Sequence, residues 1–235
     1  MNNAINETNA QYFPNRIVLL GDSIFDNSPY VEHGESVTEQ LEAIIASKET
    51  HQRNDANKTK VSLLAVDGHV MSSVDGQIAR AQSKFPVNKE YAFLSCGGND
   101  LLGYNASGLL SIASNNIGEA LSSLHDVREH FRQQYKHMLS VTLKTFPELT
   151  VCTIYDNIPT LSIAEKMALA IFNEVILREA AEHQLQVLDL RVICDHIDDY
   201  APISPIEPSK YGAKKIAHAI FEQYTNNTKG PVICA

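Results

Sequence analysis

Short apolar segments alternate along this chain with longer amphipathic segments, and a glycine follows each of the first three apolar segments within two residues. The first three, 17–20, 61–66 and 91–95, are rich in β-forming residues and show little polar alternation. Such strands are typical of parallel sheets whose two faces are both covered by helices. Two further strands are predicted at 149–155 and 185–190, and helices at 36–47, 73–82, 117–146, 163–183 and 211–224. This order predicts βαβ units and an α/β fold.

The length and composition are those of one globular domain. The chain has 235 residues, of which 44% are hydrophobic and 20% charged, enough to bury a substantial core. We expect a polar N-terminal leader at 1–15, a single domain at 16–225 and a C-terminal tail at 226–235. Two stretches lack a regular pattern: 101–116, rich in Gly, Ser and Asn, and 192–209, which contains three prolines.

Charge and cysteine usage exclude several classes of protein. The formal net charge is −9 and no Lys/Arg cluster is present, so we expect no nucleic-acid partner. No apolar run approaches the ~20 residues of a membrane span, and no signal-peptide pattern precedes the first strand, which favours a cytoplasmic protein. Cys96, Cys152, Cys194 and Cys234 are scattered without a CxxC pair. They are interpreted as reduced thiols, and we expect no metal site.

The first three strands end in similar short polar sequences. These are Gly21-Asp22-Ser23, Asp67-Gly68 and Gly97-Gly98-Asn99-Asp100. Ligands of parallel α/β sheets bind beyond the carboxyl ends of the strands. One hydroxyl, several backbone N–H groups and one carboxamide would therefore meet there, which are the parts of an acyl-transfer site. The alternative is ordinary turn chemistry, for which glycine, aspartate and serine are also suited.

The three endings, in their order along the chain, resemble the sequence blocks of the SGNH (GDSL-type) hydrolase family of esterases and lipases. The order of the blocks and their placement after strands agree with the family over most of the chain. The resemblance implies a flavodoxin-like three-layer α/β/α sandwich with a parallel central sheet of about five strands. It further implies that Ser23 is the nucleophile and that Gly68, by its N–H, and Asn99, by its side chain, stabilise the oxyanion. No cofactor is implied.

The fourth block departs from the family pattern, which has an aspartate followed three residues later by a histidine. Here the segment is Ser204-Pro205-Ile206-Glu207, so that Glu207 falls at the histidine and Ser204 at the aspartate. A serine hydroxyl needs a base to become a good nucleophile. Glutamate is a weak base unless burial raises its pKa. Glu207 is therefore either the base or a residue that only caps the last helix or faces solvent.

Histidines offer other candidate bases. His196 lies among Asp195, Asp198 and Asp199, and a loop detour could bring it to Ser23; otherwise it is a solvated loop residue. His69 follows Gly68 and either lines the pocket or lies at its rim.

Asp22 and Asp100 are expected to hold their turns by local hydrogen bonds rather than to act as acid or base.

Two functions follow from these residues. The first is a serine hydrolase that cleaves ester bonds of a small or lipid-like acyl substrate. The alternative is a catalytically impaired relative that binds a ligand or partner without turnover, because the family histidine is missing. A phosphate or nucleotide binder is disfavoured, since the chain lacks a GxGxxG or P-loop pattern. The sequence leaves the substrate and the oligomeric state open.

Overall fold

A computed structural model describes residues 14–49, 58–81, 86–226 and 233–234. All but the last two residues of the expected leader, and most of the expected tail, lie outside these ranges.

The centre of the molecule is one parallel sheet with the order β2-β1-β3-β4-β5-β8. This confirms the parallel sheet of about five strands, to which the two-residue β8 adds an edge beside β5. The order reverses at the β1/β3 neighbour pair, which is where doubly wound sheets bind ligands. The strands are β1 (Arg16–Gly21), β2 (Lys60–Leu63), β3 (Glu90–Ser95), β4 (Leu149–Cys152), β5 (Gln186–Leu188) and β8 (Ile233–Cys234).

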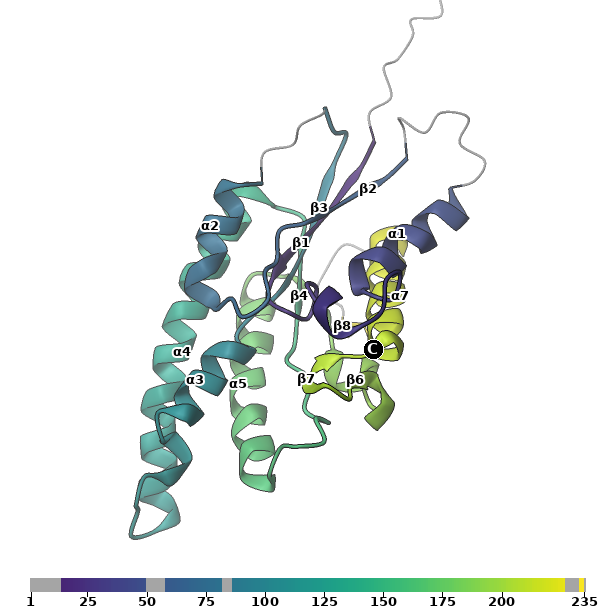
Figure 1. Ribbon diagram of the computed structural model, residues 1–235. Helices are drawn as coiled ribbons and strands as arrows, with labels where there is room; N and C mark the ends of the chain where they lie inside the picture. The colour runs from purple at the N-terminus through teal and green to yellow at the C-terminus, as the bar shows by residue number, and fades with distance from the viewer. Residues whose placement is uncertain (1–13, 50–57, 82–85, 227–232, 235) are drawn as a thin grey trace, which may run out of the picture.

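Helices cover both faces of this sheet, so the flavodoxin-like three-layer sandwich is confirmed (Figure 1). Ile17 and Leu19 of β1 pack in the core under α1 (Val37–Lys48) and α7 (Lys210–Asn226). Val18 and Leu20 point to the other core, under the second helical layer. That layer contains α2 (Val74–Ala79), α4 (Ile117–Thr145) and α5 (Ile163–Glu182), with α3 (Gly98–Ala106) packed on α4 and α5.

Two segments expected to be irregular are ordered. Much of 101–116 is helical, because α3 begins at Gly98 and the short η4 (Leu109–Ser111) follows. Within 192–209, β6 (Tyr200–Ala201) and β7 (Ser204–Pro208) form an antiparallel pair. Proline conceals this strand in the sequence, yet it is tolerated there because each strand of the two-stranded sheet is an edge. The remaining short helices are η1 (Ser28–Tyr30), η3 (Met71–Ser73), α6 (Leu190–Ile193) and η5 (Ile197–Asp199).

Several expected elements are shorter in the structure. The strands predicted at 149–155 and 185–190 extend only over Leu149–Cys152 and Gln186–Leu188. The strand predicted at 61–66 ends at Leu63, because the N–H groups of Leu64 and Ala65 both bond the carbonyl of Leu19 at 2.9 Å. The helix predicted at 73–82 ends at Ala79.

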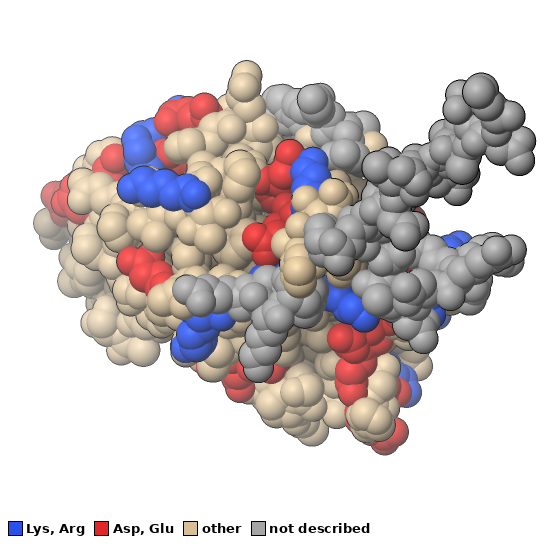
Figure 2. Space-filling view, turned by 90° about the horizontal axis from the view of Figure 1, so that it is seen from above, with Lys and Arg blue, Asp and Glu red and all other residues tan. Residues whose placement is uncertain are grey.

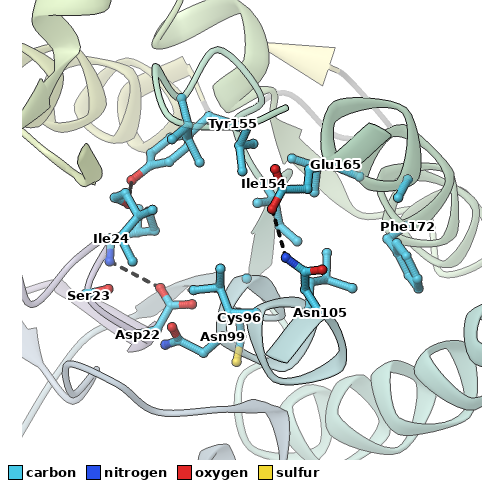
Figure 3. A pocket seen from close by; sticks show the side chains of 18 of the residues that line it. Asp22, Ser23, Ile24, Cys96, Asn99, Asn105, Ile154, Tyr155, Glu165 and Phe172 are labelled. Atoms are coloured by element: carbon cyan, nitrogen blue, oxygen red, sulfur yellow. Dashed lines mark hydrogen bonds between the residues drawn. The ribbon is translucent and has the colours of Figure 1, made fainter. Parts of the chain in front are cut away.

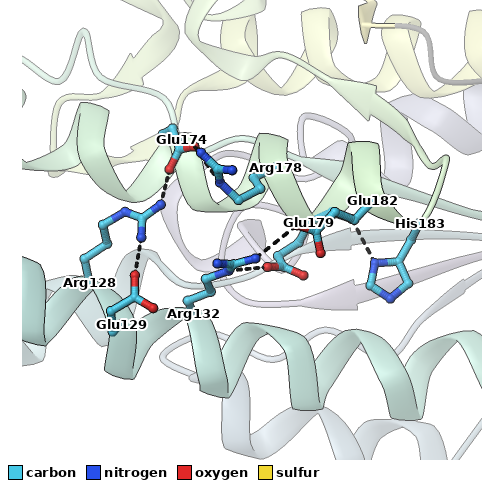
Figure 4. A network of polar contacts seen from close by, with 8 residues as sticks. All are labelled: Arg128, Glu129, Arg132, Glu174, Arg178, Glu179, Glu182 and His183. Carbon is cyan, nitrogen blue, oxygen red and sulfur yellow. Dashed lines mark hydrogen bonds and ion pairs between the residues drawn. The ribbon is translucent and has the colours of Figure 1, made fainter.

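Charged side chains join α4 to α5 (Figure 4). Arg132 contacts Glu179 at 2.5 Å and Glu182 at 3.0 Å, and Arg128 pairs with Glu174. Glu179 is completely buried between the helices. These contacts fix the second half of α5 against α4.

Acidic and basic side chains are interspersed on the face seen in Figure 2. Within the described ranges, no helix combines the length and the apolar character needed to cross a membrane. Cys96, Cys152 and Cys194 are buried free thiols, as expected.

Candidate active site

A sharp turn at the end of β1 places Ser23 at the carboxyl edge of the sheet. Gly21 has φ +123°, and a Cβ atom there would lie 1.7 Å from the carbonyl oxygen of Ser95. Only glycine fits this position. The Asp22 N–H donates to the same carbonyl at 3.1 Å, and the chain then leaves the strand. The side chain of Ser23 consequently lines a pocket while the residue is only 6% exposed.

The Asp22 carboxylate fixes this turn by accepting the Ile24 N–H at 3.2 Å, which confirms its local role. Burial raises the pKa of Asp22 to about 8, with a further contribution from the negative charge of Glu207. The Ser23 N–H finds no acceptor in the part of the chain that the structure describes. It is free to donate to a ligand.

Two further donors lie nearby, one on the loop after β2 and one in the first turn of α3. Gly68 has φ +76°, and its N–H has no acceptor among the described residues. Asn99 lines the pocket and donates one amide hydrogen to the carbonyl of His69 at 2.9 Å. An amide nitrogen carries two hydrogens, so a second remains for a ligand. The loop that bears Gly68 and the first turn of α3, which bears Asn99, are thus joined directly.

Asp100 also joins these two segments. Its carboxylate accepts the Met71 N–H at 3.1 Å, across 29 positions of sequence, and interacts with its own backbone N–H. The expected local bond is thus accompanied by a long-range one. Burial raises the pKa of Asp100.

The buried side chain of Gln77 connects the Ser23 turn to the Gly68 loop. Its Oε1 accepts the Gly21 N–H at 2.8 Å, and its Nε2 donates to the Gly21 carbonyl at 2.7 Å and meets His69 Nδ1 at 2.9 Å. Because an amide nitrogen only donates, Nδ1 of His69 carries no proton. Sequence reasoning missed Gln77, whose one signal is a polar residue on the apolar face of α2, three positions after Val74.

Glu207 lies on β7 and is 3% exposed. The backbone on either side of it is held by buried side chains. The Tyr155 hydroxyl donates to the Ile206 carbonyl at 2.5 Å, and Asn27 Nδ2 donates to the Pro208 carbonyl at 3.1 Å. The carboxyl group is thereby fixed at the pocket wall, opposite the turn that carries Ser23.

The surroundings of Glu207 favour its protonated form. Burial raises its pKa, a hydrogen bond from the Ser23 side chain opposes that shift, and the negative charge of Asp67 adds to it. Its Oε2 atom has no hydrogen-bond partner within the described ranges. Ser204 does not supply one, because residues three apart in a strand point to opposite faces.

No histidine in the described part of the chain lines this pocket. The His196 side chain is 65% exposed, and its Nδ1 accepts the Asp198 N–H at 3.2 Å. His69 lies outside the pocket lining, with Nδ1 occupied by Gln77. The structure therefore brings together Ser23, Asn99 and Glu207, with Gly68 on the adjoining loop, and leaves His196 apart.

The pocket continues from Ser23 as an apolar cavity of about 120 Å³ between α3, η4 and α5 (Figure 3). An engineered cavity of ~150 Å³ binds benzene, so this one holds a group of several carbons. Asn105 donates to Glu165 at 2.8 Å and bridges α3 to α5. Among the described residues, no cluster of His, Cys, Asp and Glu is arranged to hold a metal ion. The apolar lining includes Leu101, Leu109, Ile154, Ile158, Leu169 and Phe172.

Solved structures share this fold, although no family model and no curated protein matches the sequence. One is a member of the lipolytic protein G-D-S-L family from Veillonella parvula, with 17% identity, TM-score 0.63 and coverage of 90% of this chain and 98% of that chain. Another is an acetyl xylan esterase from Geobacillus stearothermophilus, with 12% identity, TM-score 0.62 and coverage of 95% and 99%.

A third is LAE5, an α/β hydrolase enzyme from the Lake Arreo metagenome, with 16% identity, TM-score 0.65 and coverage of 90% and 95%. The resemblance to SGNH hydrolases is thus confirmed at the level of the fold.

Proposed function

We propose that this chain is a serine esterase that hydrolyses esters of aliphatic acyl groups. The observation that carries the proposal is the meeting of Ser23 and Glu207 in the wall of one apolar pocket, where the Ser23 side chain acts on the pKa of Glu207. In this mechanism the Ser23 Oγ attacks the ester carbonyl carbon while Glu207 accepts its proton. The chain of the acyl group occupies the cavity beside α5.

The charge that develops on the carbonyl oxygen needs preorganised donors. The N–H groups of Ser23 and Gly68 and the second amide hydrogen of Asn99 fill that role. Collapse of the tetrahedral intermediate expels the alcohol, which takes the proton from Glu207. Water then attacks the acyl-serine and gives a proton to Glu207. Collapse of this second intermediate releases the acid, and Glu207 returns the proton to the Ser23 Oγ.

Glutamate suits this role only because of its environment. A general base works best when its pKa lies near the operating pH. An ordinary glutamate, at ~4.3, is too weak, whereas burial raises the pKa of Glu207. A glutamate in an apolar surrounding is a known way to run proton transfer near neutrality.

Binding without turnover is the competing function. It is favoured by one observation: Oε2 of Glu207 has no hydrogen-bond partner among the described residues. In that part of the chain, no side chain therefore orients the carboxyl group through this atom. Catalysis by a Ser23–Glu207 pair requires the neighbouring backbone to do this orienting.

The test is hydrolysis of p-nitrophenyl acetate, butyrate and octanoate by the wild type, Ser23→Ala and Glu207→Gln. We expect the loss of Ser23 to abolish turnover and Glu207→Gln to lower kcat roughly 10²–10⁴-fold, the usual contribution of a general base. His196→Gln is the matched control and should keep full activity. Turnover that survives in Ser23→Ala, or its absence from the wild type, would contradict the proposal.

A further inference from the structure

Exposed apolar side chains project from the start of α4. Ile117 is 79% exposed and Leu121, one turn later on the same face, is 55% exposed. The first fully buried residue of this helix is Phe131. The opening turns of α4 therefore extend beyond the core, and their apolar side chains have nothing in the described molecule to cover them.

A second such pair lies at the start of α5. Ile163 is 83% exposed and Met167, again one turn later, is 64% exposed. The start of this helix is fixed by a capping box between Ser162 and Glu165. Both helices begin at the same end of the molecule, the lower end in Figure 1, beyond the carboxyl edge of the sheet.

The apolar pocket opens at this end of the molecule. Leu102 and Leu110 line the pocket and are also 40% and 41% exposed. They connect the cavity wall to the surface near the two helix starts. We call the six side chains the apolar rim: Leu102, Leu110, Ile117, Leu121, Ile163 and Met167. Of these, Leu102 and Leu110 form part of the pocket wall that an entering acyl chain would contact.

The charge of this region disfavours binding to anionic lipid surfaces. Residues 98–127 contain no Lys or Arg and carry Asp100, Glu119 and Asp126. The start of α5 adds one acidic and one basic residue, Glu165 and Lys166. Anionic lipid surfaces attract basic segments and repel this one. A second copy of the chain is a poor occupant as well, because it would block the pocket entrance.

We propose that the apolar rim docks on the surface of uncharged lipid, so that an acyl chain passes from the lipid layer into the pocket. This inference rests on the proposed esterase function and names the physical form of its substrate. Apolar side chains at the boundary of a lipid layer bind in proportion to the apolar area that they bury. The interaction is accordingly insensitive to salt.

The experiment is flotation of the full chain with phosphatidylcholine vesicles, with Ser23→Ala as the background so that no lipid is consumed. We expect binding by Ser23→Ala, at least tenfold weaker binding after Ile163→Ser with Met167→Ser, and the same loss after Ile117→Ser with Leu121→Ser. Ile197→Ser with Ile203→Ser is the matched control, because these side chains are 60% and 73% exposed and lie outside the rim. It should bind like the background.

Several results would overturn the docking proposal. These are no vesicle binding by the background, equal loss in the control, or stronger binding to phosphatidylserine vesicles. A dimer in sedimentation that both rim variants abolish would assign the rim to self-association. Failure of the esterase function is seen separately, because soluble p-nitrophenyl acetate tests turnover without a lipid surface. When the rim variants are made in the chain that retains Ser23, they should hydrolyse this ester at the wild-type rate.

Discussion

The side-chain amide of Gln77 binds both backbone polar groups of Gly21, the N–H at 2.8 Å and the carbonyl at 2.7 Å. Gly21 immediately precedes the Ser23 turn, and the same amide reaches the His69 ring beside Gly68. One buried side chain therefore connects the turn of Ser23, the proposed nucleophile, to the loop of Gly68, a proposed oxyanion donor. We classify Gln77 as a positioning residue.

We predict that Gln77→Leu lowers kcat for p-nitrophenyl butyrate by at least tenfold with little change in KM. It should also destabilise the fold by roughly 1–3 kcal/mol for each backbone group left unpaired. Steady-state kinetics and urea unfolding measure the two effects.

Asn173→Leu is the control, because Asn173 holds both backbone groups of Ile154 at 2.8 Å in the same way. It should lose similar stability, but raise KM, since Ile154 lines the acyl pocket. Equal effects on kcat in both variants would make the role of Gln77 merely structural.

Tyr155 and Tyr200 provide a matched pair for testing how Glu207 is positioned. Their rings pack edge to face with centroids 5.0 Å apart. The Tyr155 hydroxyl bonds the carbonyl of Ile206, next to Glu207, whereas the Tyr200 hydroxyl bonds that of Cys194 at 2.8 Å.

We predict that Tyr155→Phe and Tyr200→Phe each lower the free energy of unfolding by about 1 kcal/mol. Only Tyr155→Phe should also reduce kcat, by several-fold, because it releases the backbone beside the base. Comparable kcat values in the two variants would argue against this positioning role.

The acid limb of the pH–rate profile should report Glu207. The carboxylate must be ionised to accept the Ser23 proton, and burial raises its pKa. We expect kcat/KM to rise with pH through a midpoint above the ~4.3 of an ordinary glutamate. Asp67→Asn should move that midpoint to lower pH, since the Asp67 charge helps to raise the pKa of Glu207. A midpoint that Asp67→Asn leaves unchanged would point to another group.

The fold could be predicted from the sequence because its signals are local. Apolar runs in β1, β3 and β4 and the helical spacing in α4 and α5 each reflect burial within one element. The position of Ser23 at the strand end could be predicted for the same reason, since Gly21 and Ser23 adjoin a strong strand. The predicted ends of the helices and strands were less accurate. In β2, for example, a backbone bond to another strand decides where pairing stops.

The support around Glu207 could not be predicted from the sequence. Asn27 and Tyr155 reach β7 from 181 and 51 positions away, and no local pattern indicates such contacts. The β6–β7 pair was hidden by its prolines, and α3 by its glycines and asparagines. Whether His196 or Glu207 meets Ser23 depends on the path of this hairpin.

The Asp22 carboxyl should produce the alkaline limb of the same profile. Burial raises its pKa to about 8, so it is neutral at pH 7 and becomes charged above pH 8. A negative charge beside Ser23 disfavours the developing oxyanion, and kcat/KM should fall there. Asp22→Asn should remove this fall, because asparagine has a similar shape and its Oδ1 still accepts the Ile24 N–H.

Stability should also depend on Asp22, at pH values between its unfolded and its folded pKa. The native state holds the Asp22 proton more tightly than the unfolded chain, whose aspartate titrates near 3.9. The stabilisation is therefore complete below that pH and is lost as the pH rises through the folded pKa of about 8. Urea unfolding between pH 4 and pH 9 should show a steeper decline for the wild type than for Asp22→Asn. An alkaline limb that persists in Asp22→Asn, with parallel unfolding curves, would assign the limb to a different group.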